Sequence, residues 1–172
     1  MLSVHERRAH EGFSIYAADE ADFALVMEGI DFLLESDPAR FNRALRHLPS
    51  ILCSPLGTSA SRSNQTLYLN PREFNGPVSV ALALVYSSMQ SAVATRYPQK
   101  EHAVSQGQRT CARDGEHFLR RAAWLQGLER AELERLIATL REAHGPGPFE
   151  TRGGQDGRRF FRDIIQYARG RW

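Results

Sequence analysis

Residue types that bind metal ions gather between residues 101 and 117 of this 172-residue sequence. The set is Glu101, His102, Cys111, Asp114, Glu116 and His117. A zinc or other divalent ion needs only three such side chains, provided that the fold draws them together. Their spacings match no metal motif, and on a helix the adjacent Glu116 and His117 diverge by about 100°. A metal-dependent enzyme with a site near His102, Glu116 and His117 is therefore one hypothesis, and a solvated helix face with capping acids is its alternative.

A second candidate lies on residues 77 to 97, "PVSVALALVYSSMQSAVATRY". Apolar residues recur along it in one stripe, and Asn75-Gly76-Pro77 precedes it, with proline in the first turn where its missing N–H does no harm. We predict a helix here. On neighbouring turns this helix carries three polar side chains, those of Tyr86, Ser87 and Gln90.

The layout of these polar residues matches a frame that zinc hydrolysis uses. Two histidines four residues apart put both imidazoles on one helical face, a glutamate beside the first deprotonates the metal-bound water, and a following helix supplies a third ligand. The motif H-E-x-x-H usually follows an apolar run and precedes a small residue. Here "VALALV" precedes "YSSMQ" and "SA" follows it, so the segment resembles the active-site helix of zincin-type metallopeptidases.

The resemblance covers about residues 50 to 125. Small members of that family place a strand and an asparagine or proline turn before the helix, as "TLYLNPREFNGP" does. They continue with a helix that carries an acidic third ligand and a Phe-Leu pair, to which "RTCARDGEHFLRRAAWL" is similar. Arg109 or a neighbour fills the slot of the third ligand. The resemblance implies a degenerate relative that lacks the H-E-x-x-H ligands.

The departures from the motif exclude zinc-water hydrolysis at this helix. Tyr86 and Gln90 do not hold zinc as neutral imidazoles do, and Ser87 cannot serve as the carboxylate base. A degenerate relative would keep its cleft as a binding surface lined by Tyr86, Ser87, Gln90 and Arg109. The alternative is a buried core helix whose polar side chains hydrogen-bond internally, and the sequence leaves both open.

The C-terminal segment from Arg152 to Trp172 is rich in arginine and aromatic residues. Its arginines include Arg158, Arg159, Arg162 and Arg169, with Phe160, Phe161, Tyr167 and Trp172 interleaved. Arginines neutralise phosphates and aromatic rings stack on bases, so a nucleic-acid-associated protein is a further hypothesis. An amphipathic helix with an apolar core face and outward arginines explains the same pattern.

Bulk properties narrow the remaining classes. The sequence lacks the glycine-rich phosphate loop, G-x-G-x-x-G after a strand, G-x-S-x-G and C-x-x-C. Its two cysteines, Cys53 and Cys111, are far apart, which argues against a disulfide scaffold and favours the cytoplasm. A formal net charge of +2 produces no strong field for polyanions. The N-terminus lacks an apolar signal region, and no apolar run approaches the roughly 18 residues of a membrane helix, so no membrane partner is expected. Because the cofactor-binding motifs named above are absent, no cofactor is expected either.

Periodicity and turn residues predict the elements. Short strands are expected at 13–18, 51–55 and 66–71, and the last two could pair as a hairpin across the Ser-rich loop 56–65. Helices are expected after Asp19 or Asp22, after Asp37-Pro38, and then at 77–97, about 101–125, 129–142 and 157–169. Residues 1–12 are expected to be flexible. Residues 13–172 then form a single globular domain, with the strands in 13–75 and a helical part in 76–172.

This order of elements predicts an α+β fold, mostly helical, in which a small antiparallel or mixed sheet of short strands packs with five to six helices. The leading functional hypothesis is a non-catalytic binding or interaction protein on a zincin-like frame without a functional zinc site. Its partner is expected to be another protein, held beside Tyr86 and Gln90 or along the charged helix 129–142.

Overall fold

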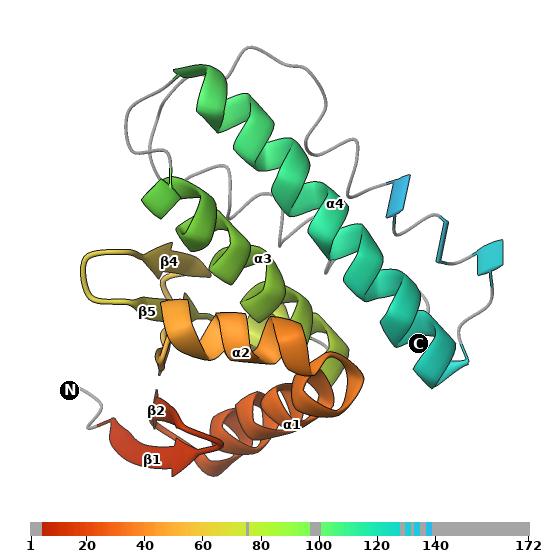
Figure 1. Cartoon of the computed structure of the whole chain (residues 1–172). Helices are drawn as coiled ribbons and strands as arrows, with labels where there is room; N and C mark the ends of the chain where they lie inside the picture. Colours follow the sequence, from red (N-terminus) through yellow and green to blue (C-terminus); the bar gives the residue numbers. More distant parts are fainter. Residues whose placement is uncertain are drawn as a thin grey trace.

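The computed structural model describes residues 5–74, 76–96 and 101–127, together with residues 130, 131, 133, 134, 137 and 138. The elements in chain order are β1 (Glu6–His10), β2 (Phe13–Ala17), α1 (Glu20–Ser36), α2 (Pro38–His47), β3 (Ser50–Cys53), β4 (Ser59–Ser61), β5 (Thr66–Leu69), the short 3-10 helix η1 (Pro71–Glu73), α3 (Pro77–Arg96) and α4 (Glu101–Gln126) (Figure 1). The predicted α+β class is confirmed.

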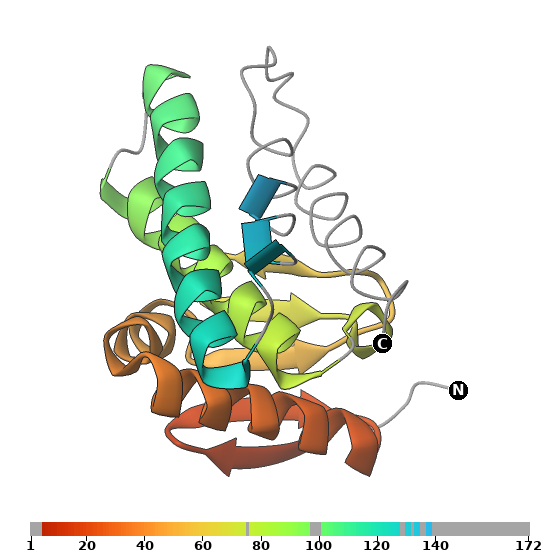
Figure 2. The ribbon, with the colours of Figure 1, turned by 90° about the vertical axis from the view of Figure 1, so that its right-hand side faces the viewer.

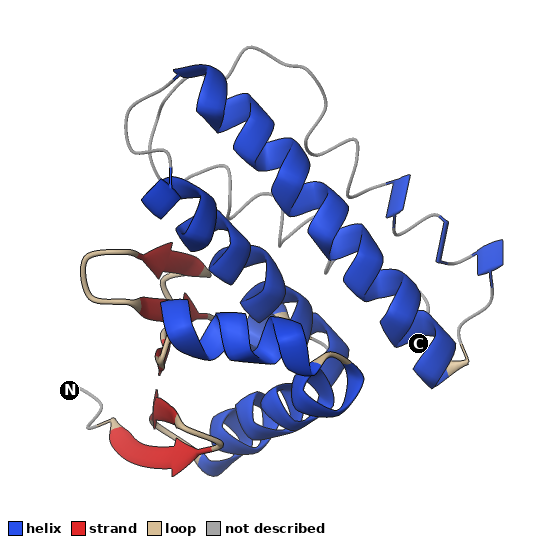
Figure 3. Cartoon of the chain, viewed as in Figure 1, coloured by secondary structure: helices blue, strands red, loops and turns tan. Residues whose placement is uncertain are grey.

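The five strands form one mixed sheet in the order β1-β2-β3-β5-β4 (Figure 3). β2, β3 and β5 run parallel, and the two outer strands are antiparallel to their neighbours. The chain passes from β2 to β3 through α1 and α2, because parallel neighbours need a crossover connection. In the views of Figures 1 and 2 the four α-helices lie on one side of the sheet, and no described element covers the other side.

Two aspartates set the helix boundaries, as the sequence predicts. Asp19 is the N-cap of α1, and its side chain accepts a hydrogen bond from the backbone N–H of Asp22 at 2.9 Å. Asp37 follows α1 and caps α2, accepting from the N–H of Arg40 at 3.1 Å, with Pro38 in the first turn. These caps satisfy N–H groups that the helices leave without internal partners.

α3 is the central helix of the fold and packs against α1, α2 and α4. Glycines permit the close approach, because a Cβ at Gly29 of α1 would lie 2.6 Å from Val80, and a Cβ at Gly107 of α4 would lie 2.6 Å from Val93. A helix that is apolar all round is a buried helix. By length and composition α3 could also cross a membrane, contrary to the expectation above, but more than half of it is buried and core helices share that property.

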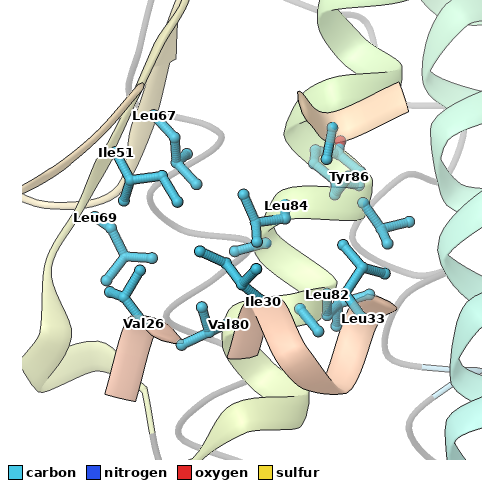
Figure 4. Packing of buried hydrophobic residues seen from close by; sticks show 14 of the residues in the cluster. Val26, Ile30, Leu33, Ile51, Leu67, Leu69, Val80, Leu82, Leu84 and Tyr86 are labelled. Carbon is cyan, nitrogen blue, oxygen red and sulfur yellow. The ribbon is translucent and has the colours of Figure 1, made fainter. Parts of the chain in front are cut away.

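The hydrophobic core fills the space between the sheet and the helices (Figure 4). Inward side chains of the strands meet those of α1 and α3, and these residues include Val26, Ile30, Leu33, Ile51, Leu67, Leu69, Val80, Leu82, Leu84 and Tyr86. Burial of such side chains is the main favourable term in folding. The cluster extends to Phe118 on α4 and to Ile137, so the residues described beyond Gln126 also contribute to it.

The structure differs from the expectations at two places in the N-terminal part. Glu6–His10 form β1, where a flexible segment was expected, because the strand pairs with β2 and two of its side chains reach α1. The His10 ring lies 2.6 Å from Asp31 of α1, and Arg8 pairs with Glu20. β3 and β5 are parallel neighbours rather than a hairpin, because the predicted loop 56–65 contains β4, which pairs with β5 instead.

The C-terminal expectations are covered only in part. The structure describes four α-helices, against the five to six predicted, but the predicted helix 157–169 lies outside the described residues. Of the predicted helix 129–142, the six described residues are helical, and Leu133 and Ile137 pack on the core as predicted. α4 continues through Gly107 and Gly115, since both glycines are buried where helices meet neighbours.

Candidate functional site

The polar residues of α3 are mostly inside the protein. Tyr86 and Ser87 are 3% and 2% exposed, whereas Gln90, one turn later, is exposed. Ser91, the next residue, is 5% exposed, so Gln90 lies on the side of α3 that faces solvent. Burial raises the pKa of Tyr86 above its ordinary value, and Cys111 on α4 adds to the shift. Tyr86 therefore packs as a neutral phenol toward α4 and does not line an open cleft.

Arg109 does not join these residues. α4 contacts α3 through Gly107, which meets Val93, and through Cys111, which lies near Tyr86. Arg109 is two positions from each, about 200° around the helix, and it is exposed on the far side. Because α4 turns Gly107 toward α3, it turns Arg109 toward solvent. The four residues expected to line a vestigial cleft are not gathered at one surface.

The metal-binding residue types of α4 are already paired or separated. Asp114 pairs with arginines of α2, Glu116 pairs with Arg120 at 3.0 Å, and His117 is exposed. Burial raises the pKa of the Cys111 thiol to about 12, which disfavours a thiolate ligand. Within the part of the chain that the structure describes, no three His, Cys, Asp or Glu side chains are placed to hold an ion. The side chains of Glu101 and His102 lie outside it.

A partly buried polar network joins α2, α3 and α4. The carboxylate of Asp114 accepts from Arg40 Nη2 at 2.8 Å and also pairs with Arg43, and Arg40 pairs in addition with Asp37. Arg43 further donates to Ser88 Oγ and to the carbonyl of Val85, both at 3.3 Å. Each charge has an opposite charge and further hydrogen bonds, the condition under which buried ions are tolerated. This network fixes the three helices together.

The side of the sheet that no described element covers, here named the open face, carries a different set of residues. Its ten outward positions are Arg7, Ala9, Ser14, Tyr16, Ser50, Leu52, Ser59, Ser61, Thr66 and Tyr68. They alternate with the buried positions of the same strands, as a pleated sheet requires, and all of them are at least partly exposed. Two tyrosines, one leucine and six small or hydroxyl side chains thus accompany a single charged residue, Arg7.

The residues of the open face are aligned in rows across the strands. Arg7 is opposite Tyr16, Tyr16 is in register with Leu52, and Leu52 is in register with Tyr68. Ser59 of β4 completes this row beside Tyr68. The row therefore places one guanidinium, two phenol rings and one leucine side by side on four adjacent strands.

Two hydrogen bonds orient side chains on the open face. Arg7 Nη2 donates to Ser14 Oγ at 3.2 Å, which keeps the guanidinium on this side of the sheet. Asn64 Nδ2 donates to the hydroxyl of Tyr68 at 3.1 Å. Because Asn64 lies in the turn between β4 and β5, this bond holds the Tyr68 ring along the strand toward the turn. Arg62, in the same turn, is exposed.

The sequence predicts only part of this surface. In β2 the alternation of Ser14 and Tyr16 with apolar residues indicates a half-exposed strand, whereas the polar β1 and the short β4 carry no such signal. The expected nucleic-acid residues Arg158, Arg159, Arg162 and Arg169 lie outside the described residues.

Comparison with known proteins yields no relationship, since no family model, no curated protein and no solved structure matches the chain.

Proposed function

We propose that this chain is a non-catalytic binding protein that recognises its partner with the open face of the sheet. The observation that carries the proposal is the aligned row of Arg7, Tyr16, Leu52 and Tyr68 on a side that no described element covers. Tyrosine and arginine are enriched at binding surfaces, because each offers a large contact area together with a polar group.

The reactive residue types of the described region support a role without catalysis. The Cys53 and Cys111 thiols are buried, and their pKa values are raised to about 12, so neither is a ready nucleophile at neutral pH. Asp114 is engaged by two arginines. Within a zincin-like frame, α3 would serve as a packing helix, with Tyr86 and Ser87 filling the core where ligands would stand.

Partner recovery from the source cells tests the proposal with a matched pair of variants. Leu52→Asp places a charge in the open face, and Leu125→Asp places the same charge on an exposed leucine of α4. After chemical crosslinking in cells, we expect the partner to be lost from Leu52→Asp and kept by Leu125→Asp, with circular dichroism showing both folded. Equal recovery from the two folded variants would contradict the proposal.

A further inference from the structure

The charges of the open face favour an anionic partner. Arg7 is the single charged residue among its ten outward positions, and none of them is a carboxylate. The exposed Arg62 adds a second guanidinium at the turn that borders the face. The nearest acid on β1, Glu6, is opposite Ala17 on the helix-covered side and pairs with Arg8. An exposed carboxylate, Glu11, lies in the turn between β1 and β2, but the outward positions themselves carry none. Guanidinium groups suit phosphate oxygens.

The aromatic rings favour bases as the neutral part of that partner. Tyr16 and Tyr68 lie two strands apart, about 10 Å at the usual strand spacing. Bases stacked in a duplex are only about 3.4 Å apart, so this separation fits bases that are splayed from one another, one on each ring. Stacking of this kind on sheet-mounted aromatic side chains is a common way to hold single strands.

The Tyr68 ring is already oriented for such a contact. The hydrogen bond from Asn64 restrains the hydroxyl end of the ring, and the side chain is partly exposed. An oriented ring loses less conformational freedom on binding. Hydroxyl groups of Ser14, Ser50 and Thr66 form the neighbouring row in register, and such groups commonly donate to phosphates and sugars.

From these features we infer that the open face binds single-stranded nucleic acid, with bases stacked on Tyr16 and Tyr68 and phosphates paired with Arg7 and Arg62. The inference rests on the proposed function and names its partner. A duplex fits less well, because the described sheet presents no helix or ribbon on this side that could enter a major groove.

Fluorescence anisotropy with labelled 15-nucleotide oligothymidine and oligouridine tests the inference on the full chain. Tyr16→Ala and Tyr68→Ala should each weaken binding about tenfold, since stacking is worth roughly that much per base. Tyr16→Phe keeps the ring and should bind like the wild type. With two phosphates paired, affinity should fall about sevenfold between 50 and 200 mM salt.

Arginine variants give matched controls. Arg7→Gln should weaken binding and flatten the salt dependence, whereas Arg113→Gln, at an exposed site on α4, should change neither. The inference is overturned if the Tyr16→Ala/Tyr68→Ala double variant, still folded, binds the oligonucleotides as tightly as the wild type. It is also overturned if Arg158→Gln/Arg159→Gln alone abolishes binding, which would assign binding to the C-terminal segment.

Failure of this inference can be separated from failure of the proposed function. If no oligonucleotide binds at low salt while Leu52→Asp still loses its crosslinked partner, the nucleic-acid assignment is wrong and the recognition surface stands. The recovered species is then a protein or a second copy of the chain, which mass spectrometry distinguishes. If Leu52→Asp keeps its partner as well, both proposals are wrong.

Discussion

The two faces of the sheet are formed by alternate residues of the same strands. Ile15 and Ile51 are in register, fully buried and covered by helices, whereas their neighbours Tyr16 and Leu52 are in register on the open face. Successive side chains of a strand point to opposite faces, so the same backbone supplies both surfaces. The helix-covered face provides stability, and the other face, which no described element covers, is the proposed recognition surface.

The two faces differ in whether their polar side chains are accessible to a partner. The helix-covered side contains the charges, thiols and phenol that resemble catalytic groups, yet packing and ion pairing occupy them. The open face contains no carboxylate, thiol or imidazole at its ten outward positions, but its side chains are partly exposed and aligned. Register separates the two roles strictly, because a slip of one residue would exchange the faces.

The largest expected effect separates the faces by stability. Ile51→Ala empties a fully buried position and should lower the free energy of unfolding by about 3 kcal/mol. Leu52→Ala, its neighbour on the open face, should cost less than about 1 kcal/mol. Urea denaturation of the two variants measures both values, and equal losses would show that the open face is covered.

The partly buried network of Asp114, Arg40 and Arg43 should contribute nearly as much to the free energy of unfolding as the side chain of Ile51. Asp114→Asn removes the charge that pairs with Arg40 and Arg43 and should cost about 3 kcal/mol, since two partly buried guanidiniums lose a partner. Glu134→Gln breaks an exposed pair with Arg120 and should leave the urea midpoint nearly unchanged, because water screens that pair. If the two variants unfold at the same urea concentration, the network does not hold the helices together.

Alkaline pH should weaken the helix-covered side specifically. The pKa values of Cys53 and Cys111 rise from 9.0 to about 12 on folding, so the folded state holds these protons more tightly. Their stabilisation is complete below pH 9 and is lost as pH rises toward 12, by about 1 kcal/mol per thiol at pH 10. Urea midpoints at pH 8 and pH 10 measure this loss.

A control for that pH dependence comes from each face. The Cys53→Ala/Cys111→Ala variant should lose less stability between pH 8 and pH 10 than the wild type, because the titrating thiols are gone. Tyr16→Phe, on the open face, should lose as much as the wild type. A cysteine-free variant with the full alkaline loss would show that other groups cause it.

The smallest expected effect concerns orientation on the open face. Tyr68→Phe removes the hydrogen bond from Asn64 and should change the free energy of unfolding by less than about 0.5 kcal/mol, because both groups are exposed to water. Oligonucleotide affinity should fall by only about twofold, since the ring remains. A Tyr68→Phe variant that unfolds at a much lower temperature would mean that this bond is part of the core.

Much of the fold was predictable from local signals. Asp19 as a cap and Asp37-Pro38 as a break are encoded in short stretches of sequence, and the apolar stripe of α1 gives its buried face. β1 was not predictable in this way, because "ERRAH" is polar and becomes a strand only by pairing with β2 and contacting α1. Tertiary context overrides local preference at edge strands.

The candidate site was less predictable for a geometric reason. Tyr86 and Gln90 are one turn apart, yet one is buried and the other exposed, because neighbouring helices cover only part of α3. Arg109 turns to solvent since Gly107 sets the phase of α4 against α3. The centre of the open face depends on the β2–β3 and β3–β5 pairings, which join strands that are not consecutive in the chain, so local patterns do not specify it.

Photo-crosslinking from defined positions tests the central claim most directly. A benzophenone amino acid replaces Leu52 on the open face in one protein and Arg113 on the exposed side of α4 in another, and both are irradiated in the source cells. The account predicts a specific adduct from position 52 and none from position 113. An adduct from position 113 with none from position 52, in folded protein, would contradict the assignment of the open face as the recognition surface.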